Sequence, residues 1–326
     1  MPFDIAIDFG DTTVTVAARG WKEAVSTPAH VAMKKDEVLY MGEEAAALFG
    51  RAPRSVSMLF PLRQGQLSSA RCLTEWVRYL YSQCAPASRL KKASAVFTLS
   101  QTGGEAMAQA LRAAAQACEM PEPMVIDRTL AAHVGAGGDP KGCEAALLAY
   151  LGEGYAAASL ICRGTVQSRA CVPGGLGEIS RSITERVRRE YGLSIGPVTA
   201  RELRGQLAAA RAIPEVHASA VGLNLATGFP DLMEIPASLG EAASLPVCDA
   251  LCECLRRAAA QAAPDSAADL SEGDVVLAGP GAGLMGLSAY ITQQTGLGCH
   301  AASGGMDKAL MRLVTDDDLK NLAHPL

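Results

Sequence analysis

Phe3-Asp-Ile-Ala-Ile-Asp-Phe-Gly-Asp-Thr-Thr-Val-Thr-Val16 opens the chain as an apolar strand, a polar turn and a second, alternating strand. This pattern predicts a β-hairpin over residues 3–18. A turn with glycine at its tight position exposes successive backbone N–H groups, and nearby hydroxyls can join them in holding phosphate oxygens. The candidate phosphate ligands of this turn are Gly10, Asp11, Thr12 and Thr13. Asp8 is the candidate for holding Mg²⁺ through water, and an ordinary polar turn is the alternative.

Two further glycine-bearing turns follow predicted strands later in the chain. Residues 145–149 lead into Tyr150-Leu-Gly-Glu-Gly-Tyr155, in which Gly152 and Gly154 take the tight positions. Residues 275–277 lead into Ala278-Gly-Pro-Gly-Ala-Gly283. In that last turn, a helix start and its backbone can approach a nucleoside or its phosphate at Gly279, Gly281 and Gly283. A connection that needs glycine only for packing is the alternative.

Composition limits the class of protein. Hydrophobic residues make up 49% and charged residues 19% of the 326 residues, which is typical of a soluble α/β protein. The net charge of −5 disfavours nucleic acid as the main partner. We predict no membrane-spanning helix and no signal peptide, because apolar runs are short and Asp4 and Asp8 interrupt the first one. The ten cysteines contain no Cys-x-x-Cys pair, so we expect reduced core cysteines and a cytoplasmic location.

The order of predicted elements indicates two related lobes. Each half begins with a hairpin and continues into strand–helix units, and residues 135–142 are rich in glycine and proline. We therefore expect a first lobe over residues 1–138 and a second lobe over residues 139–326. Helices are predicted at residues 67–81, 103–119, 128–134, 179–191, 199–212 and 238–262.

Several short motifs, spread over nearly the whole chain, carry a family resemblance. The chain resembles the bacterial actin homologues of the MreB family, which belong to the actin, sugar kinase and heat-shock chaperone superfamily. The opening segment Ile5-Ala-Ile-Asp-Phe-Gly10 is similar to the family's first phosphate loop. The other matching segments are Gly42-Glu-Glu-Ala45, Gly50-Arg-Ala-Pro53, Pro61-Leu-Arg-Gln-Gly65, Ala131-Ala-His-Val-Gly-Ala-Gly137, residues 191–200, Asn224-Leu-Ala-Thr-Gly-Phe-Pro230 and residues 277–287.

The resemblance implies an actin-like, ribonuclease H-like α/β fold. Each lobe would hold a mixed sheet flanked by helices, and four subdomains would surround a nucleotide cleft. The smaller subdomains would be inserted at about residues 22–65 of the first lobe and about residues 178–240 of the second. ATP and Mg²⁺ are the cofactors that the resemblance implies.

The departures from the family pattern fall on the chemistry. The second phosphate loop of the family reads Asp-Ile-Gly-Gly-Gly-Thr-Thr, and residues 150–156 replace its acid by Tyr150 and one glycine by Glu153. A carboxylate placed where phosphate should approach weakens binding through like-charge repulsion. The family's water-positioning glutamate is replaced by Arg128, which cannot act as a base. Asp127 would substitute for it only if the register slips, so the candidates for catalysis reduce to Asp8 and Asp127.

Other nucleotide-side positions are altered as well. The interdomain turn lacks its usual acid at Gly175-Leu-Gly177, and Arg204 and Gln206 stand where the family has lysine and glutamate. Gly175, Arg204 and Gln206 remain candidates for nucleotide contact. Losing a metal-side acid and a water-positioning acid should suppress hydrolysis by orders of magnitude.

On this resemblance we predict a divergent cytoskeletal protein that forms filaments, helps determine cell shape and organises cell-wall elongation. Its partners would be further copies of itself, a second MreB-type paralogue and the elongation machinery, at the inner face of the cell membrane. Membrane association would be weak or indirect, because the loop at residues 84–92 offers only Leu90 among basic residues. A nucleotide-free scaffold, or a pseudo-ATPase that copolymerises with a competent relative, is the alternative. An active ATPase is a further alternative, in which Asp8 and Asp11 rebuild a cation site.

Overall fold

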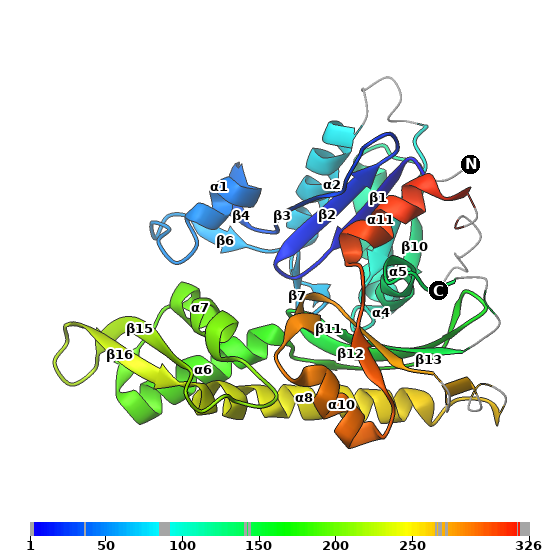
Figure 1. Ribbon diagram of the computed structural model, residues 1–326. Coiled ribbons are helices and arrows are strands. Elements are labelled where there is room, and N and C mark those ends of the chain that lie inside the picture. Colours follow the sequence, from blue (N-terminus) through cyan, green and yellow to red (C-terminus); the bar gives the residue numbers. More distant parts are fainter. Residues whose placement is uncertain are drawn as a thin grey trace.

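Two five-stranded sheets form the centre of the molecule, one in each lobe (Figure 1). The structure, a computed structural model, describes residues 3–35, 37–84, 92–139, 142, 145–264, 266, 269–270, 273–317 and 319. The first sheet has the order β10-β9-β1-β2-β3. Its strands are β1 (Ile5–Phe9), β2 (Thr13–Ala18), β3 (Val25–Pro28), β9 (Ala95–Leu99) and β10 (Met124–Asp127). The first three strands run antiparallel, whereas β9 lies parallel to β1 and β10 lies parallel to β9.

The second sheet repeats this plan in the order β13-β12-β11-β17-β18. Its strands are β11 (Ala146–Leu151), β12 (Tyr155–Cys162), β13 (Thr165–Pro173), β17 (Val275–Ala278) and β18 (Cys299–Ala301). Strands β11, β12 and β13 again run antiparallel to their neighbours. On the other side of β11, strand β17 lies parallel to β11, and β18 lies parallel to β17. The two-lobed α/β architecture with a mixed sheet in each lobe is therefore confirmed.

Helices cover both faces of the first sheet. Helices α2 (Ala70–Cys84) and α4 (Gly104–Ala117) pack together on one face. Helix α11 (Met306–Thr315) lies on the other face, against β1 and β2, although it comes from the far end of the chain (Figure 1). Because both faces are covered, all five residues of β1 are buried, and all of them except Asp8 are apolar.

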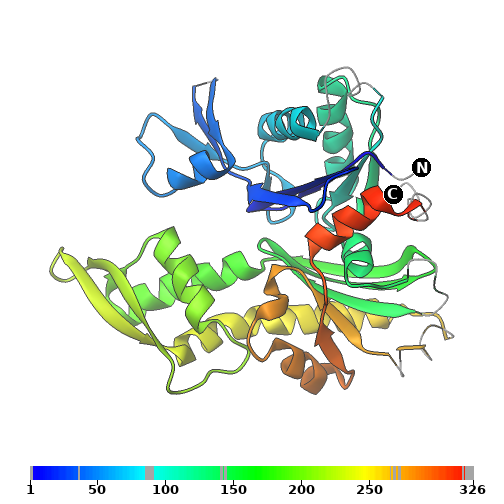
Figure 2. The same cartoon turned by 45° about the horizontal axis from the view of Figure 1, so that its top comes forward.

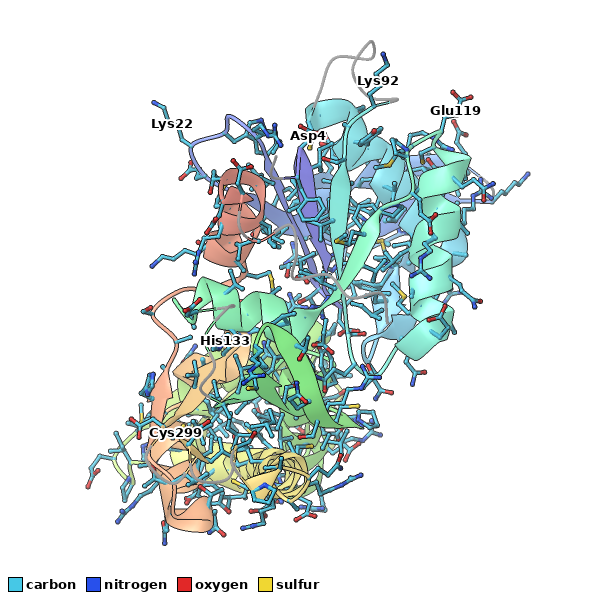
Figure 3. The ribbon with its side chains drawn as sticks, turned by 90° about the vertical axis from the view of Figure 1, so that its right-hand side faces the viewer. Asp4, Lys22, Lys92, Glu119, His133 and Cys299 are labelled. Carbon is cyan, nitrogen blue, oxygen red and sulfur yellow. The ribbon has the colours of Figure 1, made fainter. Side chains whose placement is uncertain are left out.

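Helix α5 (Arg128–Gly135) lies between the two large sheets and is buried along all eight residues. Ala131 and Val134 belong to the apolar cluster of the first lobe, which also contains α11. Leu130 and Ala132 belong to a cluster with β11 and β12 of the second lobe. Figure 3 shows His133 on this helix, in the middle of the molecule. The packing of the lobes against each other therefore runs through α5.

Helix α8 (Ala237–Ala259) supports the second sheet from its outer face and runs along the base of this lobe in Figure 1. It contains Pro246, which has no N–H to donate to the carbonyl of Ala242 one turn earlier. Arg186 supplies the missing donor, because its Nη2 lies 3.3 Å from the Ala242 oxygen. The helix can therefore continue through the proline. Beyond Pro246, its buried apolar face includes Cys248, Leu251 and Cys252.

Each lobe also carries a small three-stranded sheet, and both lie at the same end of the molecule, to the left in Figure 2. In the first lobe, this sheet has the order β5-β4-β6, and a short helix lies between β5 and β6 in the sequence. A small hairpin of two short strands, β7 and β8, follows. These elements are β4 (Val31–Lys34), β5 (Glu37–Met41), α1 (Gly42–Ala47), β6 (Ser57–Leu59), β7 (Leu62–Arg63) and β8 (Gln66–Leu67).

The small sheet of the second lobe has the order β14-β15-β16 and packs beside two helices. The elements are α6 (Leu176–Tyr191), β14 (Leu193–Ser194), α7 (Pro197–Leu207), β15 (His217–Asn224) and β16 (Pro230–Pro236). After β17 the chain forms a short 3₁₀ turn, η1 (Pro280–Gly283), and then α10 (Leu287–Thr295). The lobe boundary at residue 138 and the two insertion ranges stay predictions.

One helix end differs from its prediction. The helix predicted over residues 199–212 ends at Leu207, and Ala208 is extended with a ψ of 125°. The following residues instead join the loop after η1, because Ala209 bridges to Met285 and the Ala210 N–H donates to the Met285 carbonyl at 2.8 Å. An alanine-rich composition favours helix locally, and this tertiary contact overrides it.

The close approach of α7 and α8 gives a test of the packing. A methyl group at Gly240 on α8 would collide with the backbone carbonyl of Leu207, so Gly240→Ala should lower the free energy of unfolding by about 1–3 kcal/mol. Gly205→Ala is the matched control, because no described atom lies within 4 Å of the added methyl. It should stabilise α7 by about 0.5–1 kcal/mol. Urea unfolding measures both, and equal effects of the two variants would contradict this packing.

Candidate functional site

The first loop (residues 8–13) and the second loop (residues 150–156) end equivalent strands of the two sheets. Asp8 pairs with Thr15 across the hairpin and with Thr98 on the parallel side. Tyr150 pairs with Ala157 across its hairpin and with Ala278 on the parallel side. Tyr150 therefore takes, in the second sheet, the position that Asp8 takes in the first.

The two loops face each other at close range. A methyl group at Gly154 would collide with the Asp11 carboxylate and stand 2.7 Å from the Cα atom of Gln64. Glycine is therefore required there by the approach of the lobes. Each loop closes its own turn, since the Gly10 N–H donates to Thr13 at 2.8 Å and the Gly152 N–H donates to Tyr155 at 2.9 Å. These two hydrogen bonds fix the shape of each turn.

Arg128, the first residue of α5, occupies the space between the loops. Its Nε donates to Oδ1 of Asp8 at 2.7 Å, and its Nη2 donates to the carbonyl of Phe9. On the other side, Nη1 donates to the hydroxyl of Tyr155 at 3.2 Å. The Arg128 side chain is 2% exposed and that of Asp8 is 8% exposed, so this is a buried ion pair. Thr98 donates a further hydrogen bond to the same oxygen of Asp8.

The protonation states follow from burial and pairing. Burial alone lowers the pKa of Arg128, but the neighbouring Asp8, Tyr155 and Tyr150 outweigh it and raise the pKa well above its ordinary value. Burial raises the pKa of Tyr150 to about 12 and also raises that of Tyr155. The guanidinium is therefore charged and both phenols are neutral at physiological pH. Tyr150 does not replace the charge of an aspartate.

The residues present do not fit Mg²⁺ at Asp8. Mg²⁺ needs carboxylate or water oxygens in a near-octahedral, well-hydrated shell. Here the only loop carboxylate at the strand end is buried, and a guanidinium already holds one of its oxygens. Among the described residues, no cluster of three or more histidine, cysteine or acidic side chains could hold a metal ion. A second cation beside Arg128 would meet strong repulsion at this depth.

The second loop is filled by aromatic packing. The rings of Tyr150 and Tyr155 stack with their centroids 5.6 Å apart and an interplanar angle of 24°. The guanidinium carbon of Arg128 lies 5.8 Å from the Tyr155 ring centroid. Stacked rings and a cation over an aromatic face each contribute about 0.5–2 kcal/mol when buried.

Asp127 serves as the cap of α5. Its Oδ1 accepts hydrogen bonds from the Thr129 N–H at 2.7 Å and from the Thr129 hydroxyl at 2.6 Å. Its other oxygen lies 3.7 Å from Nη1 of Arg169 in the second lobe. This arrangement satisfies an orphan N–H at the helix start. Asp127 thus has a structural role beside Arg128, whichever residue is matched to the family glutamate.

The remaining nucleotide-side candidates lie around the second loop. Arg204 on α7 forms an ion pair with Glu153 at 2.8 Å and donates to Ser180 at 3.1 Å. Gln206, on the same helix, is exposed. Gly175 lies in a turn that packs on the second loop, because the next N–H, of Leu176, donates to the Gly152 carbonyl at 2.9 Å.

The glycine turn after β17 also packs on the second loop. Gly279 has a φ of +89°, and a methyl group there would stand 2.6 Å from the Leu151 carbonyl oxygen. Gly281 lies against the side chain of Leu151. Around Gly283, no described atom lies within 4 Å of an added methyl group. Close packing on Leu151 is therefore one reason for glycine at positions 279 and 281, and their contact with a nucleotide stays a prediction.

A cavity of about 610 Å³ opens beside the loops. Of the predicted residues it is lined by Asp11, Thr12 and Gly154, while Tyr150 and Gly279 line a separate cavity of about 280 Å³. Sequence analysis missed the aromatic and basic residues that the small subdomains contribute to the larger cavity. These residues are Phe49, Phe60, Arg63, Arg181 and Arg201. Phe49, Phe60 and Arg201 flank matched segments and Arg63 lies inside one, but isolated phenylalanine and arginine residues carry no spacing pattern that would mark them or Arg181.

The Arg128–Asp8 pair can be tested by comparing the loss of one charge with the loss of both. Arg128→Met should lower the free energy of unfolding by about 3–5 kcal/mol, because it leaves the Asp8 carboxylate buried and uncompensated. The double variant Asp8→Asn/Arg128→Met should lose less, since no charge remains unpaired. Arg78→Met is the control, because the Arg78–Glu75 pair is exposed and should contribute only about 0–1 kcal/mol. Denaturant unfolding decides, and a double variant less stable than the single one would refute the argument.

Asp11 gives a pH-dependent test. Its oxygens accept the Gly65 N–H at 2.9 and 3.2 Å, but burial dominates and raises the pKa of Asp11 above 3.8. As pH falls through the raised pKa, the folded chain takes up a proton before the unfolded chain does, so the wild type gains stability relative to Asp11→Asn. The variant should therefore be more stable than the wild type at neutral pH, and its advantage should shrink towards pH 3.8. Unfolding measured over a pH series shows this, and an advantage that is constant or grows on acidification would contradict it.

Comparison with known proteins places this geometry in a family. The family model described as MreB/Mbl protein matches residues 2–312. The cell shape-determining protein MreB of Escherichia coli (strain K12) is 26% identical over 320 residues, covering 93% of this chain and 92% of that protein. The cell shape-determining protein Mbl of Bacillus subtilis (strain 168) is 21% identical, with the same coverage of both chains.

A solved structure shows the same fold. The crystal structure of MreB5 of Spiroplasma citri bound to ADP superimposes with a TM-score of 0.85 at 18% identity, covering 95% of this chain and 93% of the other. The actin-like fold that the sequence motifs implied is thereby confirmed, and so is the family. This chain belongs to the MreB/Mbl family of bacterial actin homologues.

Proposed function

We propose that this chain is a divergent MreB-type cytoskeletal protein that forms filaments, helps determine cell shape and organises cell-wall elongation, and that its ATP hydrolysis is weak or absent. Membership of the MreB/Mbl family supports the first part, since relatives carry the name cell shape-determining protein. Assembly would involve further copies of the chain, a competent MreB-type paralogue, or both.

The observation that carries the second part is Arg128 between the loops. Phosphoryl transfer depends on charges that are already placed for the transition state, and removing one such group typically costs about 10²–10³ in rate. Here the strand-end acid of the first loop is neutralised by Arg128, and that of the second loop is Tyr150. Asp127, the nearest alternative to the missing glutamate, is held in the helix cap.

Nucleotide binding is proposed separately from hydrolysis. Two structural neighbours were crystallised with ADP and with AMPPNP, and the cavity of about 610 Å³ borders Asp11, Thr12 and Gly154. Gly10, Thr13, Gly152, Gly175, Arg204, Gln206 and the glycines of residues 279–283 remain proposed contacts of a nucleotide. Any nucleotide would be held without the Mg²⁺ position that Asp8 was predicted to supply.

The second candidate is a nucleotide-free scaffold, and the filled loops favour it. The stacked tyrosines, the Arg128–Asp8 pair and the Glu153–Arg204 pair occupy the surroundings of both loops with protein groups. Titration with a fluorescent ATP analogue separates the candidates: saturable binding at micromolar concentration favours the nucleotide-binding filament protein. Absence of binding at high micromolar concentration favours the scaffold.

We propose that the chain associates weakly or indirectly with the inner face of the cell membrane. We also propose that it has no nucleic acid partner. Within the described part of the chain, every helix is too short or too polar to cross a bilayer. The loop predicted at residues 84–92 lies mostly outside the described residues, because residues 85–91 are not among them.

Sedimentation and phosphate release test the proposed function together. The purified chain should pellet as filaments to the same extent with and without Mg-ATP. Its phosphate release should be at least roughly 100-fold slower than that of Escherichia coli MreB measured alongside as the positive control. Asp8→Asn should leave this low rate unchanged. Phosphate release comparable to the control, lost in Asp8→Asn, would refute impaired hydrolysis. Failure to pellet, both alone and mixed with Escherichia coli MreB, would refute filament formation.

A further inference from the structure

Side chains of both lobes meet at the loops. Arg128 belongs to the first lobe through α5, and two of its nitrogens donate to Asp8 and Phe9 of the first loop. Its third nitrogen, Nη1, donates to the Tyr155 hydroxyl of the second loop at 3.2 Å. One guanidinium therefore has hydrogen-bond partners in both loops at the same time.

A second layer of buried polar groups lies behind this bridge. The Thr129 hydroxyl of the first lobe lies 2.7 Å from the hydroxyl of Ser159 in the second lobe. Gln101 donates to both of these hydroxyls, and its bond to Thr129 measures 3.0 Å. Thr129 and Ser159 are fully buried. These hydrogen bonds join the two lobes behind the bridge, although Oε1 of Gln101 has no hydrogen-bond partner among the described residues.

The Arg128 bridge leaves no room between the loops for a metal-bound polyphosphate. A phosphate-bound Mg²⁺ between two such loops would be held by carboxylates on the metal and by main-chain N–H donors on the phosphate. Here Arg128 already provides the positive charge, Asp8 is its counter-ion, and the stacked rings of Tyr150 and Tyr155 exclude water from the second loop. Inserting a metal-bound polyphosphate would require breaking this buried pair.

We propose that Arg128 is a built-in clamp between the lobes, which holds them closed without nucleotide or metal. The clamp takes the place of a bound cation: it is positively charged, central and shared by both loops. Lobe closure in this chain is therefore a constant property of the fold rather than a response to ATP. The clamp is a property of single molecules, and it stands whether or not the chain polymerises.

Tyr155→Phe is the sharpest variant, because it keeps the ring and the Arg128–Asp8 pair and removes only the hydroxyl that joins the lobes. Tyr290→Phe is the matched control: it also removes a phenol hydroxyl bonded to a charged group, Asp249, but within the second lobe. Amide hydrogen exchange is measured on monomeric protein at low concentration. In Tyr155→Phe, the peptides covering residues 8–13 and 150–156 should exchange roughly tenfold faster than in the wild type, and in Tyr290→Phe they should not.

Nucleotide provides the second arm. Millimolar Mg-ATP or Mg-ADP should leave the small-angle scattering profile of the wild type unchanged, because the clamp already holds the lobes together. The clamp is overturned if Mg-ATP makes the scattering profile of the wild type more compact, or if Tyr155→Phe behaves like Tyr290→Phe. The variant Asp8→Asn/Arg128→Met, which removes both charges together, should show the same faster exchange by an independent route. Because this measurement is made on monomers, a failure here is distinct from a failure of the sedimentation test.

Discussion

Helix α5 is buried on every side, and its first residue is an arginine. Taking a guanidinium out of water costs several kcal/mol even after the protein relaxes, unless its charge and its N–H groups find partners. Arg128 finds an ion pair, a main-chain carbonyl and a phenol hydroxyl, and these partners come from both lobes. The positions of Asp8, Tyr155 and α5 are therefore mutually dependent. Moving either lobe relative to α5 would leave a buried charge partly unsatisfied.

The departures from the family pattern form physically matched groups. Arg128, in place of a glutamate, pairs with the retained Asp8, whose usual role in the family would be to attract a cation. Glu153, in place of a glycine, pairs with Arg204. Tyr150, in place of an acid, stacks on Tyr155, which replaces a hydroxyl donor. Each of these three replacements therefore has a partner that suits its chemistry.

Sequence reasoning predicted the elements better than their partners. The apolar strand and polar turn at residues 3–18 and the matching turns near residues 150 and 279 were sufficient to predict two lobes on one plan, because strand alternation and glycine turns are local signals. The role of Arg128 was not predictable in this way, since its partner Asp8 lies 120 positions away. The end of α7 at Leu207 and the rescue of Pro246 by Arg186 likewise depend on contacts between distant segments. Local patterns do not contain such contacts.

The position of α11 has a consequence for synthesis on the ribosome. Leu310, Leu313 and Val314 cover the face of the first sheet that carries Ala6 and Ala17, yet they are made after the whole second lobe. At ordinary translation rates, the interval between α5 and α11 is on the order of ten seconds or more. During that interval the nascent first lobe has one apolar face without its helix. This apolar face of a newly made chain is thus open to chaperones and to premature association. It stays open for longer than the same face would in a lobe built only from contiguous sequence.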